Sequence, residues 1–143
     1  MRFLIVVLVL MVGLMLYIRL APTNPDRWHV RLSATEPFER RQEGGFTTAR
    51  KIAAPASEVL VALERIALAT PRTTLLAGSV AEGMVTFQTR SLFWGFPDHT
   101  TVAVENDLLV VHGRLRFGRR DFGVNEARIR AWIAALGPLT EAH

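Results

Sequence analysis

An uninterrupted apolar run at the N-terminus constrains this chain more than any other feature. No charge interrupts residues Phe3 to Ile18, and Arg2 and Arg19 stand at the two ends of the run. A helix of that length reaches about 24 Å, and extension to Ala21, with the Arg19 guanidinium directed to the membrane surface, approaches the roughly 30 Å of a bilayer core. Residues 1–21 are therefore predicted to form a single transmembrane anchor.

A cleaved secretory signal is the main alternative for this run, and a buried core helix is a second. A signal has an apolar region of about 7–15 residues followed by a small-x-small cleavage site. Here Ala21 is preceded two positions earlier by Arg19 and followed by Pro22, which is a poor context for a signal peptidase. We therefore favour an anchor that is not cleaved. The basic residues flanking the run are too few to orient it across the membrane.

Composition excludes several classes of function. The chain of 143 residues contains no cysteine, which excludes disulfides, a thiol nucleophile and zinc sites built on thiolates. Without the two arginines of the anchor, the net charge of +4 falls to about +2. That charge is too small for a surface that neutralises nucleic-acid phosphates, so no nucleic-acid partner is expected.

The remainder divides into three segments. Residues 22–45 contain three prolines and no sustained period, and they are predicted to form a tether. Residues 46–137 are predicted to form one α+β domain, and residues 138–143 a short tail. Apolar periodicity and turn residues give the element order β-α-β-β-β-β-α, which indicates an antiparallel sheet with both helices on its apolar face.

Two details of this domain bear on its surfaces. From Leu108 to Phe117 the strand alternates, so that Leu109 and Val111 point to one face while His112, Arg114 and Arg116 point to the other. The final helix, which ends at Gly137–Pro138, is expected to begin with Asn125 as its N-cap.

No motif in the sequence names a reaction. The four histidines form no pair with metal-ligand spacing, and no serine lies in a nucleophile motif. We therefore assign no catalytic residue, metal or cofactor. Asp98 and His99 are adjacent on a strand, so their side chains are expected to point to opposite faces. The alternative to a protein without catalytic activity is a small hydrolase-like or isomerase-like enzyme that uses Asp98, His99 and Asp121.

Arginines are the most frequent of the remaining candidate binding residues. We predict an anion-binding site formed by the side chains of Arg114, Arg116, Arg119, Arg120 and Asn125, together with backbone amides at the start of the last helix. Its ligand would be a carboxylate or a phosphate, such as an anionic lipid headgroup. The alternative is an exposed basic face in which Asp121 pairs locally with an arginine. The aromatic loop from Phe93 to Pro97 would contact a partner or membrane, or pack over the sheet end.

Three short motifs carry a family resemblance. They are Ala54-Pro55 with Val59, the aromatic loop from Phe93 to Asp98, and a turn formed by Asp121, Gly123, Val124 and Asn125, with Arg128 one helical turn later. On these motifs, residues 52–136 resemble the bacterial and plastid family called domain of unknown function 1499. By this resemblance the motif residues that define the structure are Phe96, Asp98, Asp121, Gly123 and Asn125.

The resemblance implies a small α+β domain, often exported or membrane-tethered, and it brings no established activity, cofactor or substrate. It favours a single-pass protein of the bacterial inner membrane with its domain on the periplasmic side. We therefore expect a membrane-anchored extracytoplasmic domain that is not an enzyme. Its expected partners are the membrane, through residues 1–21, and an anionic small molecule, a lipid headgroup or another envelope protein.

Overall fold

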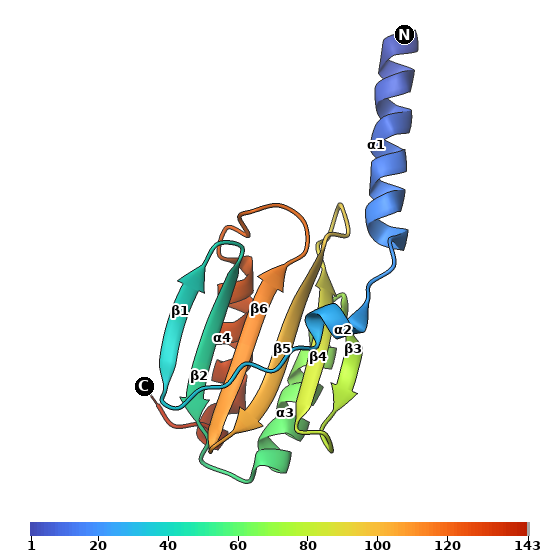
Figure 1. The fold of residues 1–143 in the computed structure, drawn as a ribbon. Helices are drawn as coiled ribbons and strands as arrows, with labels where there is room; N and C mark the ends of the chain where they lie inside the picture. The colour runs from blue at the N-terminus through green and yellow to red at the C-terminus, as the bar shows by residue number, and fades with distance from the viewer. Residues whose placement is uncertain (143) are drawn as a thin grey trace.

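The computed structural model describes residues 1–142 and consists of one long apolar helix followed by a six-stranded sheet with two packed helices (Figure 1). Along the chain the elements are α1 (Arg2–Leu20), α2 (Pro25–Trp28), β1 (Phe38–Gln42), β2 (Gly45–Lys51), α3 (Ala56–Ala69), β3 (Thr73–Ser79), β4 (Met84–Arg90), β5 (Pro97–Glu105), β6 (Leu108–Leu115), α4 (Val124–Leu136) and the 3-10 turn η1 (Gly137–Leu139). The predicted α+β class is confirmed.

All strand pairs of the sheet are antiparallel, in the order β1-β2-β6-β5-β4-β3. The register pairs Gly45 with Arg114 and Arg90 with Pro97. As a result, the turn at residues 43–44 and the loops 91–96 and 116–123 lie at one end of the sheet. Helix α1 projects away from this same end, which we call the anchor-bearing end (Figure 1). The turns at residues 80–83 and 106–107 lie at the opposite end.

Helices α3 and α4 cover one face of the sheet, as predicted. Their apolar stripes, which include Val59, Leu63, Ile129 and Trp132, pack on the inward side chains of the central strands in one continuous core. Gly113 of β6 lets α4 approach closely, because a Cβ at this position would lie 2.9 Å from both Asn125 Oδ1 and Ile129 Cδ1.

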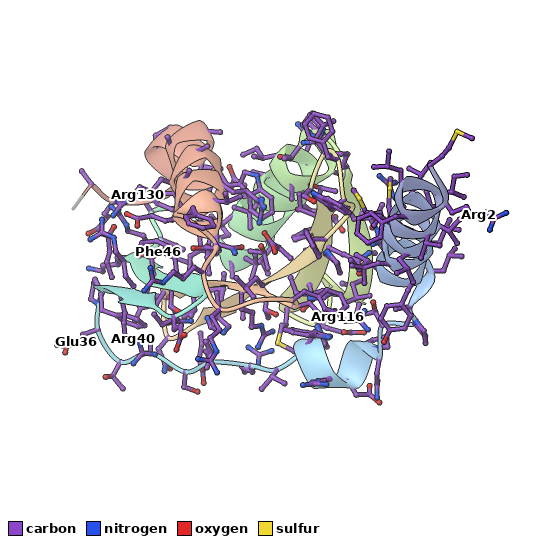
Figure 2. The ribbon with its side chains drawn as sticks, turned by 90° about the horizontal axis from the view of Figure 1, so that it is seen from above. Arg2, Glu36, Arg40, Phe46, Arg116 and Arg130 are labelled. Carbon is purple, nitrogen blue, oxygen red and sulfur yellow. The ribbon has the colours of Figure 1, made fainter. Side chains whose placement is uncertain are left out.

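A segment of irregular chain covers the other face. Residues 22–36, which we call the strap, cross in front of β4, β5, β6 and β2, while α3 and α4 lie behind the sheet (Figure 1). Figure 2 shows the same layers from above, with the strap and the helices on opposite sides of the sheet. Ala34 in the strap is buried in a second apolar cluster with Ala49, Leu108 and Val110.

The strap replaces the tether expected over residues 22–45. Its second half leads into β1, an edge strand that the sequence-based order omitted and that pairs with β2 from Phe38 to Gln42. The segment expected as a tail, 138–143, contacts the domain where the structure describes it: Thr140 forms a bridge with Ile52, and the backbone N–H of Glu141 donates to Lys51 O at 2.9 Å. His143 lies outside the described residues.

Helix α1 is long and apolar enough to cross a membrane, and its length and composition also fit a signal sequence. Its last turn is fixed to the domain. Ile18 is only 3% exposed, and Arg19 Nη2 donates to Phe93 O at 3.0 Å. Arg90 Nη1 donates to Gly95 O at 2.8 Å and to Ile18 O at 3.5 Å. The helix is therefore held against the loop 91–96.

Candidate functional site

The sheet register gathers the motif residues at the anchor-bearing end. Asp98, the second residue of β5, pairs with Leu115 at the end of β6. The chain continues from β6 through the loop 116–123 into α4. The aromatic loop 91–96 comes directly before β5. Sequence segments separated by more than twenty residues thereby form one surface.

A buried polar network connects β5 to α4 on the helix side of the sheet. Asp98 Oδ2 accepts hydrogen bonds from Arg128 Nη2 at 3.2 Å and from Asn125 Nδ2 at 3.5 Å. Arg128 Nη1 in turn donates to Asn125 Oδ1 at 2.9 Å. The Asn125 side chain is fully buried, and the absence of a side chain at Gly113 provides its space. Two of the three family motifs, the one ending at Asp98 and the one containing Asn125, are thus joined in three dimensions.

Asp121 performs the capping role that was expected of Asn125. Its Oδ1 accepts the backbone N–H of Gly123 and its Oδ2 accepts that of Asn125, both at 3.0 Å. Gly123, with φ of +79°, is the N-cap residue of α4. The prediction for Asn125 is wrong because its side chain lies in the second position of the helix, where it points to the sheet and reaches Asp98.

The environment of Asp98 opposes ionisation. Burial raises the pKa of the Asp98 carboxyl, Arg128 acts in the opposite direction through its charge and hydrogen bond, and the Asp121 carboxylate raises the pKa further. Removal of a carboxylate from water disfavours its charged form, so a second cation beside Asp98 would be stabilising.

A hollow of about 410 Å³ opens between the two loops of the anchor-bearing end, in front of Asp98. Its walls are mainly apolar, and its size lies within the range of about 300–1,000 Å³ usual for small-molecule sites. The residues around it are Ser91, Phe96, Asp98, Leu115, Phe117, Gly118, Arg120, Asp121, Phe122 and Val124.

Two of the predicted anion-binding arginines are occupied by the strap. Arg114 Nη2 donates to Trp28 O and, at 3.0 Å, to Thr101 Oγ1, and its guanidinium lies 5.3 Å from the Trp28 ring centroid. Arg116 donates to Pro22 O at 2.9 Å and to Thr23 Oγ1 at 2.8 Å. Both guanidiniums therefore hold the strap on the sheet.

Arg119 and Arg120 are the two predicted arginines that stay exposed. Neither forms a hydrogen bond or an ion pair within residues 1–142. Arg119 and Arg114 border a polar hollow of about 520 Å³ beside the turn at residues 43–44, whereas Arg120 lies at the apolar hollow. The structure therefore divides the predicted arginine group among three surfaces.

Exposed aromatic side chains surround this end. Phe122, in the loop before α4, is 91% exposed, and Phe93 is 78% exposed. Phe93 and Trp94 also form a groove of about 360 Å³ with apolar side chains of α1, namely Leu8, Met11, Val12 and Met15. The aromatic loop thus lies beside the long apolar helix.

His99 lies on the opposite face of the sheet from Asp98, as strand alternation predicts. Its ring stacks on Trp28 with ring centroids 4.1 Å apart, and Nε2 lies 3.2 Å from Gln88 Oε1. Burial, followed by the charge of Arg114, lowers the pKa of His99 to about 3. The structure brings Asp98 and Asp121 to one hollow and leaves His99 beneath the strap. Among residues 1–142, no group of side chains has the arrangement of a metal site.

Sequence reasoning did not single out Phe122 or the contacts of the strap. Phe122 stands between the turn residues Asp121 and Gly123 and has a positive φ of 53°, so the turn itself directs this ring outward. An aromatic residue between two turn residues was the available signal. The strap gave no such signal, because it contributes mainly its own backbone carbonyls, those of Pro22 and Trp28, to these contacts.

Comparison with known proteins identifies the family of this chain. A search of curated proteins found no match to this chain. The family described as "Protein of unknown function (DUF1499)" matches residues 18–136, a range that includes the strap and β1 as well as the segment 52–136 on which the resemblance rested. This chain is a member of the DUF1499 family.

Proposed function

We propose that this protein is a single-pass protein of the bacterial inner membrane with an uncleaved anchor, and that its periplasmic domain binds lipid headgroups at the bilayer surface. The domain is not an enzyme in this proposal. Its anchor-bearing end lies against the bilayer, and Arg119 and Arg120 contact headgroup phosphates.

One observation carries the proposal: exposed aromatic and basic side chains share the end of the domain from which α1 emerges. Phe93 and Phe122 come from separate loops, and both are largely exposed. Aromatic side chains are favoured at the membrane interface, and a basic residue beside an anionic bilayer contributes about 1 kcal/mol. Exposed Arg119 and Arg120 supply that charge next to Phe122.

The junction with α1 supports a fixed orientation of the domain. Ile18 is buried against the domain, and Arg19 and Arg90 hydrogen-bond across to the loop 91–96. A membrane-spanning α1 would therefore place this loop at the bilayer surface. Cleavage near Ala21 would remove Ile18 and Arg19 from these contacts, which favours an anchor that is retained.

A site-specific probe tests the contact with the bilayer. Because the chain has no cysteine, Phe122→Cys introduces a unique thiol for an environment-sensitive fluorophore in the full chain in lipid nanodiscs. The matched control is Ala81→Cys, an exposed position in the turn at the opposite end of the sheet. We expect blue-shifted emission and quenching by nitroxide lipids at position 122 alone. Water-like emission from both probes would refute the docking.

A further inference from the structure

The apolar hollow contains an acceptor that forms no hydrogen bond within residues 1–142. Asp98 Oδ2 accepts both hydrogen bonds from α4, whereas Oδ1 accepts none from any residue in 1–142. Asp98 borders the hollow. The Asp98 side chain is partly exposed, so Oδ1 is within reach of a ligand, and a cationic donor forms a stronger bond to a carboxylate than water does.

The charges around the hollow also favour a cation at its base. Asp98 and Asp121 bring two carboxylates, and the Arg128 guanidinium is the buried cation that pairs with Asp98. Burial and the Asp121 charge raise the pKa of Asp98, so the ionised carboxylate is under-compensated. A ligand ammonium would supply the missing charge.

Phenylalanine rings form the walls beside this carboxylate. Phe96 and Phe117 lie with ring centroids 6.1 Å apart, and Phe122 borders the hollow with its ring directed outward. Ring faces attract cations, and clusters of aromatic rings are used to bind ammonium groups in proteins. The aromatic walls of the hollow and the carboxylate at its base thus both favour an ammonium group.

The rim carries the opposite charge. Arg120 lies at the hollow, is exposed and has no partner within residues 1–142. A guanidinium binds phosphate oxygens in a bidentate manner. The site therefore presents a carboxylate inside and a guanidinium outside, so its complement is a ligand with an ammonium at its tip and a phosphate behind it.

We infer that this hollow binds the phosphoethanolamine headgroup of an aminophospholipid. The ammonium donates to Asp98 Oδ1 between the phenylalanine rings, and the phosphate binds Arg120. This inference rests on the proposed function, because the docked orientation brings the hollow to the headgroup layer. A choline headgroup has no N–H to donate to Asp98, and a glycerol headgroup has no positive charge, so both are poorer ligands.

Native mass spectrometry of the full chain in detergent tests the inference. The purified protein is mixed with equal amounts of phosphatidylethanolamine, phosphatidylcholine and phosphatidylglycerol, and the bound lipid is identified. We expect phosphatidylethanolamine to be retained about tenfold more than each of the others, the preference expected of one charge-assisted hydrogen bond. Equal retention of the three lipids would overturn the inference.

Variants locate the binding and identify its source. Asp98→Asn should remove the preference for phosphatidylethanolamine. Arg120→Gln, at an exposed position whose side chain has no partner within residues 1–142, should reduce the retention of this lipid about tenfold. Arg65→Gln on α3 is the matched control and should bind as the wild type does. Unchanged retention in Arg120→Gln would overturn the assignment. Displacement by soluble phosphoethanolamine would identify the free headgroup as sufficient, whereas retained selectivity without displacement would identify the membrane lipid as the ligand.

The two proposals fail independently. Because lipid retention in detergent does not require a bilayer, equal retention combined with a bilayer-buried probe at position 122 would refute the headgroup site alone. A clear preference for phosphatidylethanolamine combined with a water-like probe would refute the docking alone.

Discussion

Mild acid should destabilise this protein through His99 and His112, a buried and a half-buried histidine on the strap side of the sheet. Burial, then the charge of Arg114, lowers the pKa of His99 to about 3. The same causes, in the same order, lower the pKa of His112 to about 4. His99 is fully buried beneath Trp28, whereas His112 is half-buried, with Nδ1 2.6 Å from Thr47 Oγ1.

The size of the effect follows from the pKa of histidine in an unfolded chain, about 6.5. A group with a lower pKa in the folded state contributes its full stabilisation above pH 6.5 and loses it as the pH falls toward the folded value. At pH 5, each histidine removes about 2 kcal/mol of stability relative to pH 7, or about 4 kcal/mol together. Most carboxylates, with pKa near 4, are still charged at pH 5, so this interval isolates the histidines.

Urea unfolding of the full chain in detergent, followed by tryptophan fluorescence, measures this difference. The informative variant combines His99→Phe, which keeps a ring against Trp28, with His112→Asn, which keeps a polar group beside Thr47. The wild type should lose about 4 kcal/mol between pH 7 and pH 5, and the double variant should lose less than 1 kcal/mol. An equal loss in both proteins would show that the two histidines are not the titrating groups.

Two further predictions concern the start of α4 and the orientation of the domain. Asp121→Ala should reduce the free energy of unfolding by about 1 kcal/mol, the usual contribution of a capping side chain, because its carboxylate accepts the backbone N–H groups of Gly123 and Asn125; an unchanged urea midpoint would contradict the role of this cap. An alkaline-phosphatase reporter fused to the C-terminus should be active in bacterial cells, since that enzyme requires the periplasm, and an inactive but stable fusion would contradict the proposed side of the membrane.

Apolar residues that recur with period two in strands and period 3.6 in helices were sufficient to predict which face of the sheet the helices cover. The alternation in β6 correctly separated Leu109 and Val111 from His112 and Arg114, and the same rule placed Asp98 and His99 on opposite faces. These features depend only on neighbouring residues of one strand, because burial of one face determines which side chains point inward.

Features that depend on distant irregular chain were not predictable in the same way. The strap has no period because its path is fixed by individual contacts, such as Arg114 with Trp28 O and His29 Nδ1 with Thr86 Oγ1 at 2.8 Å. In the sequence, where this cover is not visible, the basic strand face has the pattern of a free anion site. The role of Asn125 was also missed, because helix capping is a local pattern whereas its contact with Asp98 spans 27 residues.

The strap imposes an order on the biosynthesis of this protein. Residues 22–36 leave the ribosome before any strand of the sheet, yet Arg114 and Thr101, which bind Trp28, are made about eighty residues later. The segment that follows α1 therefore emerges well before the residues that fix it on the sheet. Until β6 is complete, Trp28 and Ala34 lack the partners that cover them, and we expect this interval to be the stage of synthesis most open to aggregation and to binding by chaperones.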